Sequence, residues 1–192
     1  SVISLNYFTN TLSAVLLLFT ILFYIFVYTI WLKRKTPQNI VIGGAAGALP
    51  PIIGWTIATN SISIEPISLF LIIFFWTPSH FWALSLYKAS DYKKAKIPML
   101  PVSEGIEKTK IYIFVYSLLM VPTIILPYII NFAGLIYLIP STLLTIYYCL
   151  ICYELMNFDK NKFNSKQAKK VFTYSIFYLF LIFVFFLFDS LI

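Results

Sequence analysis

The stretch FWTPSHFWALSLYKASDYKKAKIPMLPV, residues 75–102, decides the fold of this chain. It begins as an apolar run and then changes to a segment that carries four lysines among few apolar residues. An apolar run that ends abruptly in cations is typical of a transmembrane helix leaving the bilayer. His80, the only histidine of the chain, lies in the apolar part.

The composition extends this pattern to the whole chain. Of the 192 residues, 60% are hydrophobic and 11% are charged, and the mean hydropathy is +0.88. Soluble domains carry roughly 25% charged residues, so the composition excludes a water-soluble globular domain. It predicts an all-α fold, a polytopic transmembrane helix bundle that forms a single domain over residues 1–192. We expect six spanning helices, over residues 12–32, 40–58, 66–87, 111–130, 133–153 and 171–188.

The positive charges predict the orientation in the membrane. All fourteen lysines and arginines fall within residues 33–35, 88–110 and 160–170. With six helices, these three clusters meet at one face, whereas the connections around 59–64 and 131–133 have no Lys or Arg. The positive-inside rule then makes the basic loops cytoplasmic and the C-terminus external. Topology thus accounts for the net charge of +7, and we expect no nucleic acid partner.

The second predicted helix is rich in small residues. It reads NIVIGGAAGALPPIIGW, in which Gly43 and Gly47 have the spacing that lets helices approach closely. Pro50 and Pro51 remove two backbone donors and should break the helix within the membrane. Two interpretations stay open: a tightly packed, kinked helix, or a kink that also opens a substrate cavity.

The segment 88–110 is predicted to be a long connection on the basic face. Pro98 and Pro101 favour extended backbone. Because structureless loops of more than about 12–15 residues are usually functional or disordered, we expect an ordered lid over a cavity that opens to the cytoplasm.

His80 is a candidate functional residue because ionisable groups within the membrane face the bundle interior. It could be a neutral core histidine bonded to a backbone carbonyl that Pro78 leaves free. Alternatively, it could be an axial ligand of a metalloporphyrin or a hydrogen-bond donor to a buried substrate. A lone histidine does not make a zinc site. If the helix continued to Asp91, the two residues would lie roughly 16 Å apart along its axis.

Polar groups that suit a phosphorylated ligand lie at the basic ends of the first and third helices. Tyr28, Lys33 and Arg34 occupy one end, and Asp91 and Lys94 lie beyond the other. A carboxylate among cations suits a polyanion that arrives with Mg²⁺, since the metal takes oxygen ligands and phosphate takes Lys or Arg. Lysines beside a membrane also simply bind anionic lipid.

Two segments carry a resemblance to a known family. YTIWLKRKTPQNIVIGGAAGALPPIIGW, residues 28–55, and WTPSHFWALSLYKASDYKKAKIPMLPV, residues 76–102, resemble the heme O synthases, the protoheme IX farnesyltransferases of the UbiA-type intramembrane prenyltransferases. The rest of the chain is similar in topology and only loosely in residues. The resemblance covers about the last two thirds of a family member.

The resemblance implies a reaction and its site. Family members transfer the farnesyl group of farnesyl diphosphate to a vinyl group of protoheme IX (heme b), which gives heme O for heme-copper terminal oxidases. By matching position, Asp91 would hold Mg²⁺, and Lys33 and Arg34 would bind the diphosphate in a catalytic role. The diphosphate site would also include Tyr28 and Lys94, and His80 would contact the heme. Protoheme is then a substrate, Mg²⁺ the cofactor, and the lipid bilayer and a downstream heme A synthase are further partners.

The sequence departs from the wider superfamily at two motifs. The D-x-x-x-D pattern stands here as Asp91 followed by Ala95, which leaves one carboxylate. The first acidic motif, N-D-x-x-D-x-x-x-D, is absent. Since nine spanning helices are usual in the family, we expect that three helices and this motif precede Ser1, and that the 192-residue chain alone is inactive.

Other functions compete with this one. A heme-binding assembly factor, or a polytopic transporter without transferase activity, would also have a broken helix and a buried histidine. A prenyltransferase of quinone or chlorophyll precursors is a third alternative. The excess of Ile, Lys, Asn and Phe is compatible with an AT-rich bacterial genome and favours a bacterial inner membrane over a mitochondrial one.

Overall fold

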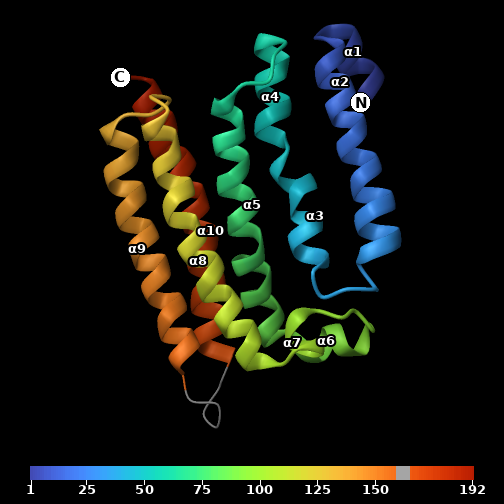
Figure 1. Ribbon diagram of the computed structural model, residues 1–192, viewed down its shortest axis with the longest axis vertical. Coiled ribbons are helices and arrows are strands. Elements are labelled where there is room, and N and C mark those ends of the chain that lie inside the picture. The colour runs from blue at the N-terminus through green and yellow to red at the C-terminus, as the bar shows by residue number, and fades with distance from the viewer. Residues whose placement is uncertain (159–164) are drawn as a thin grey trace.

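The computed structural model describes residues 1–158 and 165–192 as a bundle of helices, with no strand among them (Figure 1). The helices are α1 (Val2–Phe8), α2 (Thr11–Leu22), the π-helix η1 (Phe23–Leu32), α3 (Asn39–Ala48), α4 (Pro50–Thr59), α5 (Ile64–Tyr87), α6 (Ala89–Lys94), α7 (Leu100–Ser103), α8 (Ile106–Ile129), α9 (Leu135–Asn157) and α10 (Ser165–Ser190).

Six segments of the described chain are long and apolar enough to cross a membrane, which confirms the predicted all-α bundle. They are Thr11–Leu32, Asn39–Thr59, Ile64–Tyr87, Ile106–Ile129, Leu135–Asn157 and Ser165–Ser190. Three helix ends differ most from the expectation: α8 and α10 begin earlier and α9 ends later. Their additional turns carry charged residues, so these helices extend beyond the apolar stretch on which the prediction was based.

The connections sort to the two ends of the bundle as the charge pattern predicts. Residues 33–38 and the helices α6 and α7 lie at one end, together with the start of α10 (Figure 1). The connections α4–α5 and α8–α9, and both chain termini, lie toward the other end. Of the third basic cluster, Lys160 and Lys162 are outside the described residues, whereas Lys166, Lys169 and Lys170 belong to α10.

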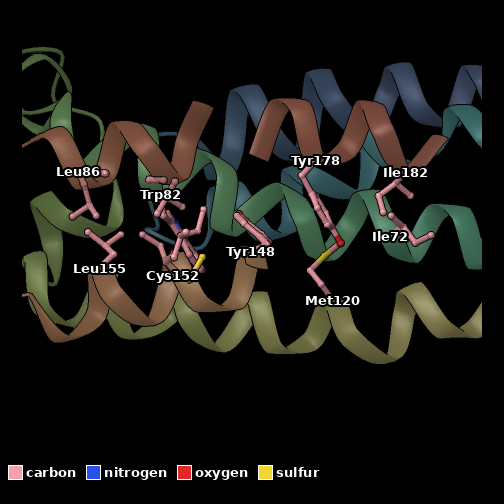
Figure 2. Packing of buried hydrophobic residues seen from close by; sticks show 14 of the residues in the cluster. Ile72, Trp82, Leu86, Met120, Tyr148, Cys152, Leu155, Tyr178 and Ile182 are labelled. Atoms are coloured by element: carbon pink, nitrogen blue, oxygen red, sulfur yellow. The ribbon is translucent and has the colours of Figure 1, made fainter. Parts of the chain in front are cut away.

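The core lies between α5, α8, α9 and α10. Figure 2 shows Trp82 and Leu86 of α5 in one continuous cluster with Met120, Tyr148 and Tyr178 of the other three helices. In contrast, α2 and η1 bury little of their surface within the described structure. They join the bundle chiefly through α3 and α4.

The second spanning segment breaks at Leu49, as Pro50 and Pro51 predicted. Pro50 opens α4, where a missing backbone donor costs least, and Figure 1 shows the change of direction between α3 and α4. The glycines of α3 allow close packing on both sides. A Cβ on Gly43 would overlap the Tyr28 ring, and one on Gly44 would lie 3.0 Å from Thr77 Cγ2.

The segment 88–110 is largely folded. It contains α6 and α7, and Met99, Leu100 and Pro101 are buried. The expectation of extended backbone holds for Met99 (φ −65°, ψ 151°) and is wrong at Pro101, which lies in the first turn of α7. Lys110 belongs to α8 and is fully buried, with its Nζ 2.9 Å from Glu107 Oε1. The connection is therefore shorter than its sequence suggested, and it is anchored to the bundle.

Candidate functional site

His80 lies about two turns before the end of α5, in the half of this helix that faces the basic end of the bundle. The helix continues through Pro78 and ends at Tyr87. Asp91 belongs to the separate helix α6, which lies across the end of the bundle (Figure 1). The expected separation of roughly 16 Å between His80 and Asp91 therefore does not apply, because it assumed one continuous helix through both residues.

Aromatic rings from two helices hold the imidazole. The Trp76 ring stacks on one side with centroids 4.2 Å apart, and the Phe172 ring of α10 stacks at 4.6 Å. Phe81 meets the imidazole edge-on at 5.2 Å. The partner of Nδ1 is Ser175 Oγ of α10, at 2.7 Å, and not the backbone carbonyl that the core-histidine alternative required.

His80 lines an open-sided cavity of about 570 Å³ between α5 and α10, in which Ile176, Phe180 and Leu187 are exposed. His80 is 8% exposed, so a small part of the ring reaches this space. The volume lies within the usual range for small-molecule sites, about 300–1,000 Å³. Apart from His80 and Trp76, the lining is aliphatic or aromatic and comes from α10: Ile176, Leu179, Phe180, Phe183, Val184 and Leu187.

A second cavity, of about 260 Å³, lies next to the first. Trp76 lines both cavities. The second one is bordered by η1, α3 and α5, through Tyr24, Tyr28, Ile40, Gly43, Gly44, Gly47, Ile73, Thr77 and Phe81. A Cβ added to Gly47 would meet no atom within 4 Å, so the missing side chain leaves open space here. The first half of the broken helix, α3, therefore borders a cavity, and the binding of a substrate there stays a prediction.

The π-helix η1 contributes two tyrosines to this second cavity. Its ten residues close i→i+5 hydrogen bonds, and the last of them joins Lys33 N to Tyr28 O at 2.8 Å. π-Helical turns are rare and occur frequently at functional sites. The apolar sequence of this segment gave no indication of the wider turns.

The structure brings Lys33 and Tyr28 together. Lys33 Nζ lies 6.0 Å from the centre of the Tyr28 ring, at the limit for a cation–π contact. Lys33 is half-buried, and Arg34 next to it is exposed. A cation thus lies beside the tyrosine that borders the second cavity, and the role of both residues in binding diphosphate stays a prediction.

Asp91 and Lys94 are exposed on α6. Asp91 Oδ2 lies 3.4 Å from Lys88 Nζ, and the ion pairs of the described residues do not join Asp91 to Lys33, Arg34 or Lys94. Asp91 and Lys94 therefore lie at the same end of the bundle as Lys33 and Arg34, but no ion pair of the described residues joins Asp91 to these cations.

Tyr92 follows Asp91 and is half-buried. Burial raises the pKa of the Tyr92 phenol, and the neighbouring Tyr87 and Asp91 raise it further. The hydroxyl therefore stays protonated at neutral pH and can donate a hydrogen bond to an anion at this end of the bundle.

The described residues do not form a complete metal site. They contain no group of three His, Cys, Asp or Glu side chains close enough to hold an ion. Asp91 alone could give one oxygen ligand to Mg²⁺, which usually keeps several waters and binds through one or two carboxylates and substrate phosphates.

Three residues of the site were not predicted from the sequence: Trp76, Phe172 and Ser175. Trp76 resembles any other aromatic residue of an apolar helix. Ser175 is 95 positions away from His80, and its polar side chain in the apolar run of α10 was the one signal that could have found it.

Comparison with known proteins gives one family. The UbiA prenyltransferase family matches residues 1–177. A protoheme IX farnesyltransferase of Pelagibacter ubique is 74% identical over the whole chain, which covers 63% of that relative. Proteins of the same name from Parvibaculum lavamentivorans and Orientia tsutsugamushi are 51% and 53% identical over 95% of this chain, and over 58% and 57% of their own lengths. No solved structure matches. The chain thus spans less than two thirds of the curated relatives that it matches.

Proposed function

Because the chain belongs to the UbiA prenyltransferase family, we propose that it acts in the transfer of a farnesyl group from farnesyl diphosphate to a vinyl group of protoheme IX. The product is heme O. The observation that carries this proposal is His80, which is fixed between two aromatic rings at the edge of an apolar cavity of about 570 Å³. The names of the relatives support the same substrate.

The first step is the binding of the two substrates in the two cavities that meet at Trp76. The apolar α5–α10 cavity accepts the porphyrin, with the imidazole of His80 turned toward it. The cavity beside Tyr28 accepts the start of the farnesyl chain, so that its diphosphate lies at the basic end near Lys33 and Arg34. Lys94 on α6 is a further contact for the diphosphate at that end.

The second step is cleavage of the allylic C–O bond, whose electron pair leaves with the diphosphate. Lys33 and Arg34 stabilise the negative charge that develops on the leaving group. The positive charge on the farnesyl carbon faces the rings of Tyr24, Tyr28 and Trp76, which border the cavity and stabilise a cation through their faces.

The third step joins the two substrates. The π electrons of the heme vinyl group attack the farnesyl carbon and form the new C–C bond. Water then adds to the resulting cation and loses a proton, which gives a hydroxyethylfarnesyl side chain. The apolar lining keeps bulk water from reaching the farnesyl cation before the vinyl group does.

Mg²⁺ is proposed as the cofactor because prenyl diphosphates carry several negative charges. A bound ion would supply Lewis-acid stabilisation of the leaving diphosphate, and Asp91 would be one of its ligands. The described residues provide one carboxylate of this site rather than a complete set of ligands.

The membrane is proposed to be a bacterial plasma membrane, in keeping with the bacterial relatives. The Lys and Arg residues of the described chain gather at the end that contains α6 and α7. By the positive-inside rule this end is cytoplasmic, and the opposite end, with the C-terminus, is external. Farnesyl diphosphate then arrives from the cytoplasm, and a heme A synthase in the same membrane would take up the product.

An assay in membranes tests the proposed function. The chain is expressed alone and joined to the part of the Pelagibacter relative that it does not span, then incubated with protoheme, farnesyl diphosphate and Mg²⁺. Mass spectrometry should find farnesylated heme in at least one of the two. Bound heme without product in both would instead favour a heme-binding assembly factor. If neither product nor bound heme is found, both of these functions are excluded and the transporter is the function that remains.

A further inference from the structure

The contacts of Ser175 determine which nitrogen of His80 carries the proton. Ser175 Oγ donates a hydrogen bond to Phe172 O at 2.6 Å. A serine hydroxyl has one proton, so in the contact with His80 Nδ1, at 2.7 Å, the serine oxygen must be the acceptor. Nδ1–H is therefore the donor, and in the neutral ring Nε2 has an unprotonated lone pair.

Nε2 has no hydrogen-bond partner among the described residues, whereas Nδ1 has one. Trp76 and Phe172 cover the two faces of the ring. Phe81 lies against another part of the ring at 5.2 Å. His80 lines the α5–α10 cavity and keeps 8% of its surface exposed. Nε2, the ring nitrogen without a partner in the described part of the chain, is thus the nitrogen that remains available to a ligand.

A second hydrogen bond fixes Ser175 itself. Trp76 Nε1 donates to Ser175 O at 2.9 Å. Ser175 consequently binds α5 twice, through its main chain to Trp76 and through its side chain to His80 one helical turn further on. These bonds couple the position of the imidazole to the packing of α10 against α5.

We propose that Ser175 is a positioning residue, which holds His80 in the Nδ1–H tautomer and presents Nε2 to the α5–α10 cavity as a ligand for the iron of a metalloporphyrin. Histidines that bind metals usually donate their second ring N–H to an acceptor, which sets the tautomer and the ring orientation. The identification of the ligand as a metalloporphyrin rests on the proposed function. The assignment of the tautomer is independent of that function.

Nitrogen NMR tests the tautomer without heme or activity. Because His80 is the only histidine, ¹⁵N-histidine labelling of the chain in lipid nanodiscs gives signals from one imidazole. At neutral pH we expect a protonated, pyrrole-type Nδ1 and an unprotonated, pyridine-type Nε2. If the unmodified protein instead shows a protonated Nε2, or protons on both nitrogens, the inference is overturned.

The chain offers a matched control for Ser175. Ser117 of α8 is fully buried and also bonds the carbonyl three residues before it, Phe114 O, at 2.7 Å. Ser175→Ala should mix the two tautomers, whereas Ser117→Ala should leave the spectrum unchanged. Ser175→Thr keeps a hydroxyl and should restore the Nδ1–H form. An unchanged spectrum in Ser175→Ala, with helicity retained, would show that Ser175 does not set the tautomer.

Titration with hemin tests the iron ligand. We expect the unmodified chain to show an Fe–N(His) band by resonance Raman spectroscopy in the ferrous state, and His80→Ala to lack it. Ser175→Ala should shift this band and weaken heme binding about 10- to 100-fold, and Ser117→Ala should change neither. Bound heme without a band that depends on His80 would overturn the ligation, even if farnesylated heme were formed. An intact band with no product would instead count against the proposed function alone.

Discussion

Two consecutive polar side chains of α5 form hydrogen bonds to the helices around it. Ser79 Oγ lies 2.8 Å from Tyr148 OH of α9, and the next residue, His80, binds Ser175 of α10. Burying such groups without partners would cost about 1–3 kcal/mol each. Two consecutive polar residues therefore require α9 and α10 to pack at fixed positions against α5, and they connect the fold to the site.

Asp91→Asn should separate farnesyl transfer from heme binding. Because Asp91 is proposed as a ligand of Mg²⁺, loss of its carboxylate charge should lower the rate of heme farnesylation by about 100-fold or more, the scale of losing one electrostatic contact in a transition state. The rate is measured by mass spectrometry, and heme binding is measured by hemin titration in the same membranes.

Glu104→Gln is the matched control for Asp91→Asn. Glu104 is an exposed acid of the same segment, and it pairs with Lys108 at 2.6 Å. Its replacement should leave the rate unchanged. Equal rates for Asp91→Asn and the unmodified protein would contradict the assignment of Asp91 to the diphosphate site.

Lys33→Gln and Arg34→Gln should each raise the KM for farnesyl diphosphate, by about 10- to 150-fold if one charge-assisted hydrogen bond of about 1.5–3 kcal/mol is lost. Lys35→Gln is the control, because Lys35 is exposed and adjacent but was not assigned to the site. The KM is measured by varying farnesyl diphosphate at saturating protoheme. An equal increase in all three variants would indicate a general attraction of anions to this end of the bundle, rather than a specific contact.

At the scale of the helices, close packing of α3 against η1 depends on a glycine. A Cβ on Gly43 would overlap the ring of Tyr28, which borders the second cavity. Gly43→Ala should therefore destabilise the protein by about 1–3 kcal/mol, as other overpacking substitutions do. Gly54→Ala in α4 is the control: no atom lies within 4 Å of its Cβ position, so only the better helix propensity of alanine should act. The free energy of unfolding in mixed micelles measures both, and equal values would refute the close approach.

The π-helix η1 and the α3–α4 break border the same region of the bundle. Both depart from a regular α-helix, and residues of η1 and α3 line the second cavity. Only the break was predictable, since proline has no N–H and ends a helix by known chemistry. The wider turns of η1 have no comparable residue signal.

At the scale of the whole molecule, Asp189 joins the last two helices far from the basic end. Gly134 N and Tyr137 N, at the start of α9, donate to the Asp189 carboxylate of α10 at 2.5 Å and 3.2 Å. A carboxylate at a helix N-terminus is favourable for both its hydrogen bonds and the helix dipole. Asp189→Ala should lower the free energy of unfolding by about 1–2 kcal/mol.

Glu154→Ala provides the comparison for Asp189→Ala at the opposite end of the same two helices. The Glu154–Lys170 pair is 3.0 Å long and exposed, so its loss should cost about 0–1 kcal/mol. Unfolding in mixed micelles gives both values. A larger effect at Glu154 than at Asp189 would contradict the capping role.

Two single-cysteine variants test the orientation in the membrane. Ser61 lies between α4 and α5 and Ser90 lies in α6, and both are exposed at opposite ends of the bundle. With Cys149 and Cys152 replaced by serine, a membrane-impermeant maleimide should label Ser61→Cys in intact cells. It should label Ser90→Cys only after the membrane is permeabilised. The reverse pattern would invert the proposed topology.

The sequence by itself determined the fold class, the six spanning helices, the gathering of cations at one end and the break at Pro50. Each follows from local chemistry. The length of an apolar run determines a spanning helix, the cations determine at which end of the bundle a connection lies, and proline ends a helix because it lacks an N–H donor. The sequence also singled out His80, because an ionisable ring in an apolar helix is costly unless it has a partner.

Only the tertiary structure decided what His80 contacts and where the cavities lie. Ser175 and Phe172 reach the imidazole because α10 packs against α5, a contact between residues more than 90 positions apart. The separate helix α6 placed Asp91 differently from the straight-helix expectation, since the direction of the chain after Tyr87 depends on the buried residues Met99, Leu100 and Pro101. Periodicity and charge act within one helix, whereas these features depend on how several helices fill the same space.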